Sequence, residues 1–237
     1  MGSIQADVCV VGAGFTGLGV ALELASKGHS VVVLEAKTVG FGASGRNGGQ
    51  IASGYAAGMM DAQKIVGADD VTKLWEFSET AKQILYNRIN RFKIECDLGR
   101  GELYVAPKES HLKWLREEQN FCEVTFGYSG YRWVEQDEIR SLMAGDRYVG
   151  GLLDDEGGHL HPLNYTLGLA DAAVNAGALI FENTAALEIE KGTNIGVRTA
   201  LGHVTANALV LAGNAYLHEF YIEPQKHILP VESSILA

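Results

Sequence analysis

The chain has 237 residues, 47% hydrophobic and 20% charged, which is enough apolar material for one large domain or two small ones and excludes a disordered chain. Its 19 basic and 29 acidic residues give a net charge of −10, which argues against nucleic acid or an anionic membrane surface as the main partner. The three cysteines, Cys9, Cys96 and Cys122, are far apart and lack zinc-type spacing, so we expect no metal site and a reducing, cytoplasmic compartment.

The N-terminal segment predicts a strand, a helix and a second strand. Residues 6–11 are apolar and β-branched, as in a strand buried on both faces of a parallel sheet. A helix follows Gly14 and ends near Gly28, and residues 30–36 form the next strand. Acidic Asp7 precedes this apolar region and glycines interrupt it, so we expect no membrane span.

A GxGxxG pattern connects the first strand to the helix. It consists of Gly12, Gly14 and Gly17, and the helix begins within it at Phe15 and Thr16. The first glycine permits a tight turn, the second lets backbone approach a diphosphate, and the third allows the helix to pack closely on the sheet. The helix N-terminus favours an anion through its free N–H groups and positive dipole end.

An acidic residue ends the second strand. Glu35, followed by Ala36, lies eighteen positions beyond Gly17, where its carboxylate can accept hydrogen bonds from ribose hydroxyls and would repel a 2′-phosphate. The strand–helix–strand unit and this acid together predict an adenine dinucleotide. They do not by themselves separate FAD from NAD.

The rest of the chain alternates glycine-rich and periodic segments. Residues 39–58 are dense in glycine and predict a ligand loop. A long amphipathic helix capped by Asp69 or Asp70 should follow. The residues expected on its buried face are Leu74, Trp75, Ser78, Ala81, Leu85 and Phe92. Further strands are expected at 102–106, 131–135, 179–183, 186–191, 195–199, 203–205 and 208–213, and further helices at 109–121, 136–143 and 162–175.

The segment GASGRNGGQ, residues 42–50, resembles the signature of the D-amino-acid-oxidase-like superfamily of FAD enzymes. The likeness is strongest to γ-glutamylputrescine oxidases and related amine oxidoreductases, and it extends over residues 8–36, 161–178 and 209–216. The resemblance implies FAD as cofactor. It also implies an α/β fold, a Rossmann-like FAD-binding domain with an inserted α+β substrate domain.

The same resemblance sets the expected domain boundaries. The discontinuous FAD-binding domain would comprise residues 1–90 and 150–220, and parts of the substrate domain would comprise 91–149 and 221–237. Residue 237 falls within an apolar segment, so we expect the chain to be the N-terminal part of a longer protein. A missing C-terminal segment or a second chain would then complete the flavin site.

The resemblance also implies further cofactor contacts. Ser44, Arg46 and Asn47 would donate hydrogen bonds to the diphosphate or ribityl chain, while Gly48 and Gly49 would bring backbone N–H groups to the flavin ring near N5 and N4. Two later segments would also touch the cofactor. These are Ala185 and Ala186, over the adenine, and Ala212, Gly213 and Asn214, at the end of a parallel strand.

The implied reaction is oxidation of a C–N bond in a small-molecule amine or amino acid. Hydride would pass from the substrate to flavin N5, the imine would hydrolyse, and oxygen would be reduced to peroxide. No residue stands out as a catalytic acid or base. Three alternatives remain open: an FAD-dependent dehydrogenase with a quinone acceptor, a nicotinamide-dependent dehydrogenase, for which residues 42–50 have no use, and a non-catalytic FAD-binding fragment or subunit.

Overall fold

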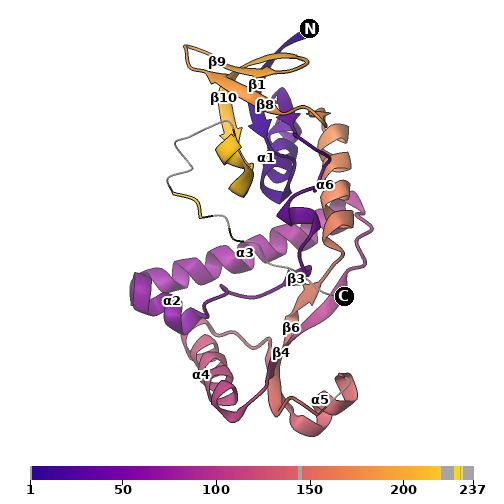
Figure 1. Ribbon diagram of the computed structural model, residues 1–237. Helices are drawn as coiled ribbons and strands as arrows, with labels where there is room; N and C mark the ends of the chain where they lie inside the picture. Colours follow the sequence, from indigo (N-terminus) through magenta and orange to yellow (C-terminus); the bar gives the residue numbers. More distant parts are fainter. Residues whose placement is uncertain (1, 144–145, 220–226, 230, 232–237) are drawn as a thin grey trace. The chain divides into compact units, whose positions relative to one another are not determined.

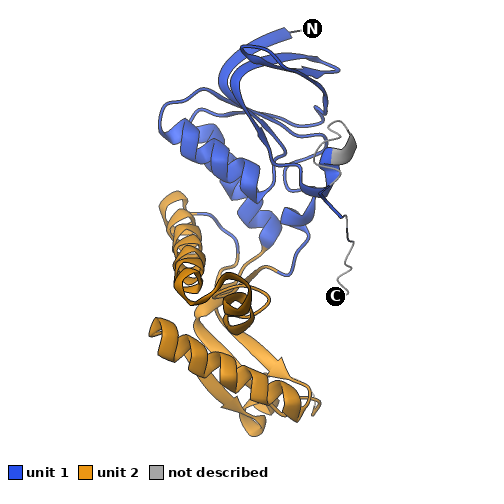
Figure 2. Ribbon diagram, turned by 90° about the vertical axis from the view of Figure 1, so that its left-hand side faces the viewer, with its two compact units in different colours: residues 1–48, 94–96, 162–237 blue, residues 49–93, 97–161 orange. Residues whose placement is uncertain are grey.

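A computed structural model of the chain describes residues 2–143, 146–219, 227–229 and 231. The chain divides into two compact units, coloured separately in Figure 2. Unit 1 comprises residues 1–48, 94–96 and 162–237, and unit 2 comprises residues 49–93 and 97–161. None of the helices in the described residues is long and apolar enough to cross a membrane.

Unit 1 is built on a mixed sheet. In the described part of the chain this sheet has six strands in the order β7–β2–β1–β10–β9–β8. Figure 1 labels β1, β8, β9 and β10 of this sheet. The first four run parallel, and β9 and β8 extend the sheet as antiparallel strands. The strands are β1 (Gly2–Val11), β2 (Val31–Leu34), β7 (Leu179–Phe181), β8 (Ala186–Glu190), β9 (Ile195–Thr199) and β10 (Gly202–Leu211). This arrangement confirms the predicted α/β, Rossmann-like fold.

Strand β2 and the last three residues of β1 are buried on both faces of the sheet, which explains their uninterrupted apolar sequences. The helices of unit 1 are α1 (Phe15–Ser26) and α6 (Pro162–Asn175). On the face toward α1, Val10 Cγ1 lies 3.2 Å from the point where a Cβ on Gly17 would stand. On the other face, Cys9 and Val11 belong to one core cluster with Val197 of β9. Burial raises the pKa of the Cys9 thiol to about 12, consistent with a small hydrophobic side chain in the core.

Strand β10 corrects one expectation. The segments 203–205 and 208–213, expected as separate strands, form one continuous strand. The reason is that β1, with ten residues, pairs with β10 over its whole length, from Gly2↔Gly202 to Val11↔Leu211. Strand β9 pairs only with the first half, residues 203–206.

Unit 2 contains a second sheet and four helices among the described residues. Strand β6 lies in the middle, with β4 on one edge and β5 and β3 on the other. The strands are β3 (Gln50–Ile51), β4 (Gly99–Ala106), β5 (Tyr131–Glu135) and β6 (Gly150–His159). The helices are α2 (Met59–Val66), α3 (Ala68–Phe92), α4 (Glu109–Phe126) and α5 (Gln136–Leu142).

Three of these elements, α2, β3 and β6, have no counterpart among the elements expected from the sequence. Strand β6 reads GGLLDDEGGH, with four glycines and three acidic residues, which disfavours a strand. Its glycines are explained by close packing across the sheet. A Cβ on Gly151 would stand 2.6 Å from the carbonyl oxygen of Tyr104, and a Cβ on Gly158 would stand 2.6 Å from that of Gly99.

The buried face of helix α3 is shifted from the one expected. The fully buried side chains are Val71, Trp75, Lys82, Tyr86 and Ile89. Of the expected set Trp75 is buried, Leu74 packs half-buried against the same core cluster, and Ala81 is exposed. An apolar pattern cannot find this face because a lysine lies in it. The Lys82 ammonium is satisfied inside unit 2, 2.9 Å from Glu79 Oε2 and 2.5 Å from Ser53 Oγ.

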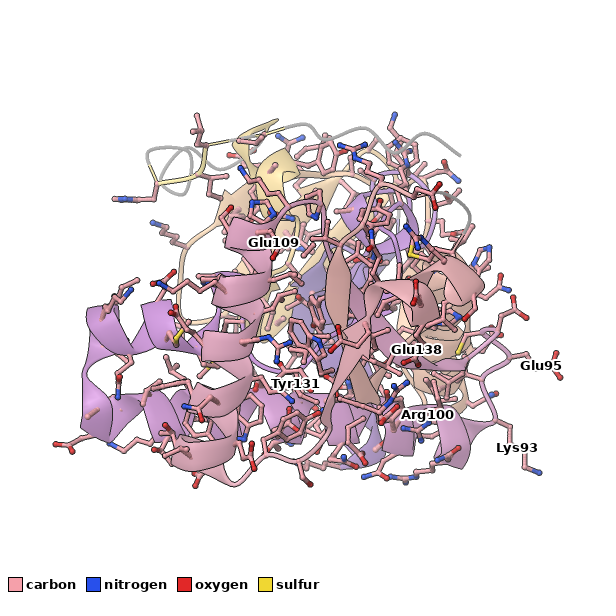
Figure 3. The ribbon with its side chains drawn as sticks, turned by 90° about the horizontal axis from the view of Figure 1, so that it is seen from below. Lys93, Glu95, Arg100, Glu109, Tyr131 and Glu138 are labelled. Carbon is pink, nitrogen blue, oxygen red and sulfur yellow. The ribbon has the colours of Figure 1, made fainter. Side chains whose placement is uncertain are left out.

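The hydrogen bonds of Lys82 continue into the second sheet. Ser53 Oγ lies 3.0 Å from Tyr128 Oη, and Tyr128 donates to Asp154 Oδ1 at 2.5 Å. The Asp154 side chain on β6 has no exposed surface. Tyr131 of β5, labelled in Figure 3, packs edge-to-face against Tyr128, with ring centroids 4.9 Å apart. This buried network ties α3 to β6 and explains why polar residues occupy the interior of unit 2.

The compact units divide the chain at other positions than the expected domains. Residues 49–90 and 150–161 group with unit 2, because α2 and α3 pack with α4 and because β6 is the middle strand of the second sheet. Residues 94–96 group with unit 1, where a Cβ on Gly168 of α6 would stand 2.3 Å from Ile94 Cγ2. The expectation for residues 221–237 falls mostly outside the described residues.

Candidate functional site

A cavity of about 330 Å³ lies in unit 1 where β1, β2 and β10 end. Its walls come from these strand ends, the turn before α1, the loop around η1 (Ala43–Gly45), the start of β8 and the turn η2 (Asn214–Glu219). In open α/β sheets, ligands bind outside the carboxyl ends of the parallel strands. The cavity therefore has the position of a nucleotide site.

The glycines of the first turn are required by close contacts. Gly12 has φ +107°, and a Cβ there would stand 2.6 Å from the carbonyl oxygen of Ala212. A Cβ on Gly17 would stand only 1.9 Å from the carbonyl oxygen of Gly12. A Cβ on Gly14 would meet Ser44 Oγ at 2.7 Å. The absence of side chains lets α1 start directly beneath the cavity.

Glu35 is fixed at the cavity wall by backbone donors. Its Oε2 accepts a hydrogen bond from the N–H of Ala13 at 2.8 Å, and its Oε1 accepts one from the N–H of Lys37 at 2.9 Å. Its own backbone is held by Phe181 and Thr184. The carboxylate is thus oriented before any ligand binds, and the remaining lone pairs of both oxygens can accept further hydrogen bonds.

The loop around η1 is braced by its own side chains. Ser44 Oγ accepts a hydrogen bond from the N–H of Phe15, at 2.9 Å, and so caps the start of α1. The Asn47 amide donates to the carbonyl oxygens of Ala43 and Ser44, both at 3.0 Å. The Arg46 guanidinium stacks 4.2 Å from the ring centre of Phe41. A preformed loop needs less ordering when a ligand binds.

The structure brings together most, but not all, of the residues expected to contact cofactor. Those that line the cavity are Gly12, Gly14, Glu35, Ala36, Ser44, Ala185, Ala186, Ala212, Gly213 and Asn214. Those that do not line it are Phe15, Thr16, Gly17, Arg46, Asn47, Gly48 and Gly49. Gly17 has the packing role predicted for it, whereas Gly49 belongs to unit 2 and accepts a hydrogen bond from the Leu160 N–H.

Sequence reasoning missed several residues of the cavity wall, chiefly Lys37, Phe41, Leu187, Tyr216 and Leu217. Lys37 and Leu187 directly follow the expected residues Ala36 and Ala186, so extending each expected segment by one position would have found them. Tyr216 and Leu217 lie in the turn η2, beyond the last expected contact. Among the residues that the structure describes, no group of three or more His, Cys, Asp or Glu side chains is arranged to hold a metal ion.

The residues at the cavity fit an adenine dinucleotide. The oriented Glu35 carboxylate suits ribose hydroxyls, and the N-terminus of α1 suits a diphosphate. The Ser44 hydroxyl, which accepts from Phe15, keeps its own proton for a phosphate oxygen. The short side chains of Ala185 and Ala186 leave room for a flat base. Fold and site together define a dinucleotide-binding α/β protein.

Comparison with known proteins identifies the family. Residues 7–237 match the family described as FAD dependent oxidoreductase (DAO), and the chain belongs to this family. FAD, the cofactor expected from the sequence, is therefore the cofactor of the family.

Two curated relatives are similar over nearly the whole chain. A probable oxidoreductase OrdL of Haemophilus influenzae is 43% identical, over 98% of this chain and 55% of that protein. A gamma-glutamylputrescine oxidoreductase of Escherichia coli is 42% identical, over 99% of this chain and 55% of that protein. The chain thus spans about half the length of these relatives.

Solved structures share the fold at lower sequence identity. Glycine oxidase from Geobacillus kaustophilus superposes with a TM-score of 0.73 and 21% identity, over 92% of this chain and 57% of that one. L-amino acid deaminase from Proteus myxofaciens superposes with a TM-score of 0.75 and 23% identity, over 93% of this chain and 48% of that one. These similarities extend through both units of the chain.

Proposed function

We propose that unit 1 binds the ADP half of FAD in the cavity where β1, β2 and β10 end, and that unit 2 is part of a substrate domain. One observation carries this proposal: the Glu35 carboxylate accepts a hydrogen bond from the N–H of Ala13 in the glycine-rich turn. Glu35, proposed to bind the ribose, and the glycine-rich turn, proposed to bind the diphosphate, therefore line the same cavity. The α1 N-terminus and Ser44 hold the diphosphate, and Ala185 and Ala186 border the adenine.

We further propose that the complete protein oxidises the C–N bond of an amine or amino acid. The relatives named as gamma-glutamylputrescine oxidoreductase and glycine oxidase support this substrate class. FAD, when bound, supplies the hydride acceptor at its N5 atom. The residues of this chain bind and orient the cofactor, and a preorganised site of this kind lowers the barrier by positioning. We assign no catalytic acid or base.

We also propose a reducing, cytoplasmic compartment, which the three free, buried cysteine thiols support.

The flavin site is proposed to need a further segment, from a longer polypeptide or a second chain. Within the described residues, the second half of β10, residues 208–211, pairs with β1 on one edge and with no strand on the other. These residues read ALVL but are exposed or half-buried, whereas all four residues of β2 are buried. An open edge beside an apolar half-strand favours pairing with another strand.

This proposal predicts little turnover from the 237-residue chain alone. Without the further segment the flavin ring would be poorly held and open to water, so hydride transfer would lack positioning and electrostatic support. The test is to purify the chain, measure flavin per chain, and follow peroxide with γ-glutamylputrescine, polyamines and amino acids. We expect substoichiometric flavin and little peroxide.

Three outcomes would change the account. Full flavin occupancy with brisk peroxide formation from the isolated chain would contradict the need for a further segment. Flavin bleaching by an amine with no peroxide, but with transfer of electrons to a quinone-type dye, would identify a dehydrogenase instead of an oxidase. If an FAD-loaded longer form of the protein were bleached by no amine or amino acid, the proposed reaction would be wrong.

A further inference from the structure

The turn after β10 is held in a fixed position beside the cavity. Asn214 has φ +48° and reverses the chain, and the N–H of Tyr216 donates to the carbonyl oxygen of Gly213 at 3.0 Å. Leu217 is buried, with Cδ2 2.8 Å from the point where a Cβ on Gly213 would stand. In Figure 1 this turn follows β10 at the yellow end of the colour bar. With Leu217 anchored inside, the turn presents Tyr216 at the cavity wall.

The ring of Tyr216 is exposed although it lines the cavity. It is 52% exposed, and its Cε2 edge lies 3.4 Å from the point where a Cβ on Gly42 would stand. Gly42 is two residues before Ser44, whose hydroxyl caps α1 through Phe15. The ring edge therefore lies against the loop whose Ser44 side chain caps α1.

Aromatic edges carry partial positive charge, and aromatic side chains gain most from contacts that remove their surface from water. A scattered exposed aromatic needs no explanation, but Tyr216 is anchored by its neighbours and faces a cavity. A diphosphate on the α1 N-terminus would meet the positive edge of this ring. The ring would in turn shield the diphosphate from water, which strengthens its attraction to the helix N-terminus.

We propose that Tyr216 is a specificity-determining residue of the cavity, whose ring covers the diphosphate portion of the bound adenine dinucleotide. This inference rests on the proposed function of unit 1. The contact is assigned to the ring because its Cε2–Cδ2 edge, and not the hydroxyl, lies within 4 Å of the Cβ position of Gly42. Tyr216 therefore favours ligands that carry a diphosphate over ligands that carry the adenine and ribose alone.

The test compares ADP and adenosine as ligands of the 237-residue chain by calorimetric titration. Tyr216→Ala should weaken ADP binding about tenfold, and Tyr216→Phe should stay within about threefold of the parent. Adenosine, which has no diphosphate, should bind all three proteins within about threefold of one another. The matched control is Tyr55→Ala, because Tyr55 is also exposed, at 45%, but lies in unit 2 and does not line the cavity.

Each alternative outcome has a definite meaning. Unchanged ADP binding by Tyr216→Ala would overturn the inference and leave the proposed function intact. Equal losses for ADP and adenosine would also overturn it, because they would show that Tyr216 only supports the shape of the turn. A loss in Tyr216→Phe as large as in Tyr216→Ala would move the contact to the hydroxyl and contradict the ring. No binding of ADP by the parent would overturn the proposed function and the inference with it.

Discussion

Replacing Gly17 with alanine is expected to lower the free energy of unfolding by about 3 kcal/mol, at the upper end of the usual cost of overpacking. The added Cβ would stand 1.9 Å from the carbonyl oxygen of Gly12, a backbone atom, so only a shift of the backbone can relieve the clash. Helix α1 would have to shift away from β1, which would loosen its packing on Val10 and distort the tight turn. Urea denaturation followed by circular dichroism measures the effect.

The control for this prediction is Gly28→Ala. Gly28 has φ +86° but no heavy atom within 4 Å of its Cβ position, so alanine there meets backbone strain and no clash. We expect a cost of about 1 kcal/mol for the strain alone. Equal costs at the two positions would show that the contact between α1 and the glycine-rich turn is looser than described.

Replacing Glu35 with alanine is expected to weaken the binding of FAD and of ADP by roughly 1.5–3 kcal/mol, about 10- to 150-fold, the range for hydrogen bonds to a charged acceptor. The fold should survive, because the side chain is only partly buried and its removal would leave the N–H groups of Ala13 and Lys37 facing the cavity, which both residues line. Titration calorimetry measures the affinity, and circular dichroism checks the fold.

A nearby carboxylate provides a matched control. Glu182 also accepts a backbone hydrogen bond, from the N–H of Val39 at 2.6 Å, but it does not line the cavity. Glu182→Ala should therefore leave ADP affinity within about twofold of the parent, since only contacts with the ligand change affinity directly. If Glu35→Ala bound FAD as tightly as the parent, the assignment of Glu35 to the ribose would be wrong.

The nucleotide cavity could be predicted largely from the sequence because its chemistry is local. Gly12, Gly14 and Gly17 lie within six consecutive positions, and their spacing alone specifies a tight turn entering a helix. Glu35 ends the neighbouring strand, so its place beside the turn follows from parallel pairing of β1 and β2. Motifs of this kind do not depend on distant segments.

The missed features depend on contacts between segments far apart in the sequence. Lys82 is buried because Glu79 and Ser53 satisfy its charge, which no hydrophobic pattern can indicate. Strand β6 tolerates its glycines because both edges are paired with other strands. Tyr216 reaches the cavity only because Leu217 anchors the turn. Propensity and periodicity describe a segment by itself, so tertiary contacts override them at such places.

The side chains of the loop around η1 show a second limit of sequence reasoning. Arg46 and Asn47 are suitable donors for a diphosphate, yet the structure directs them to Phe41 and to the loop backbone. Residue type indicates what a side chain can bind, and only the geometry shows what it does bind. Their contact with cofactor stays a prediction.

The central claim is that this chain binds the ADP half of FAD, and direct titration with FAD and with NAD⁺ tests it. The account predicts that the 237-residue chain binds FAD in preference to NAD⁺, a preference that the predicted contacts of residues 46–49 with the flavin would supply, and that ADP competes with FAD for one site. Any cofactor released from the purified protein should have the absorbance spectrum of a flavin. Tight binding of NAD⁺ with no affinity for FAD, or a released cofactor that absorbs as a nicotinamide, would contradict the claim.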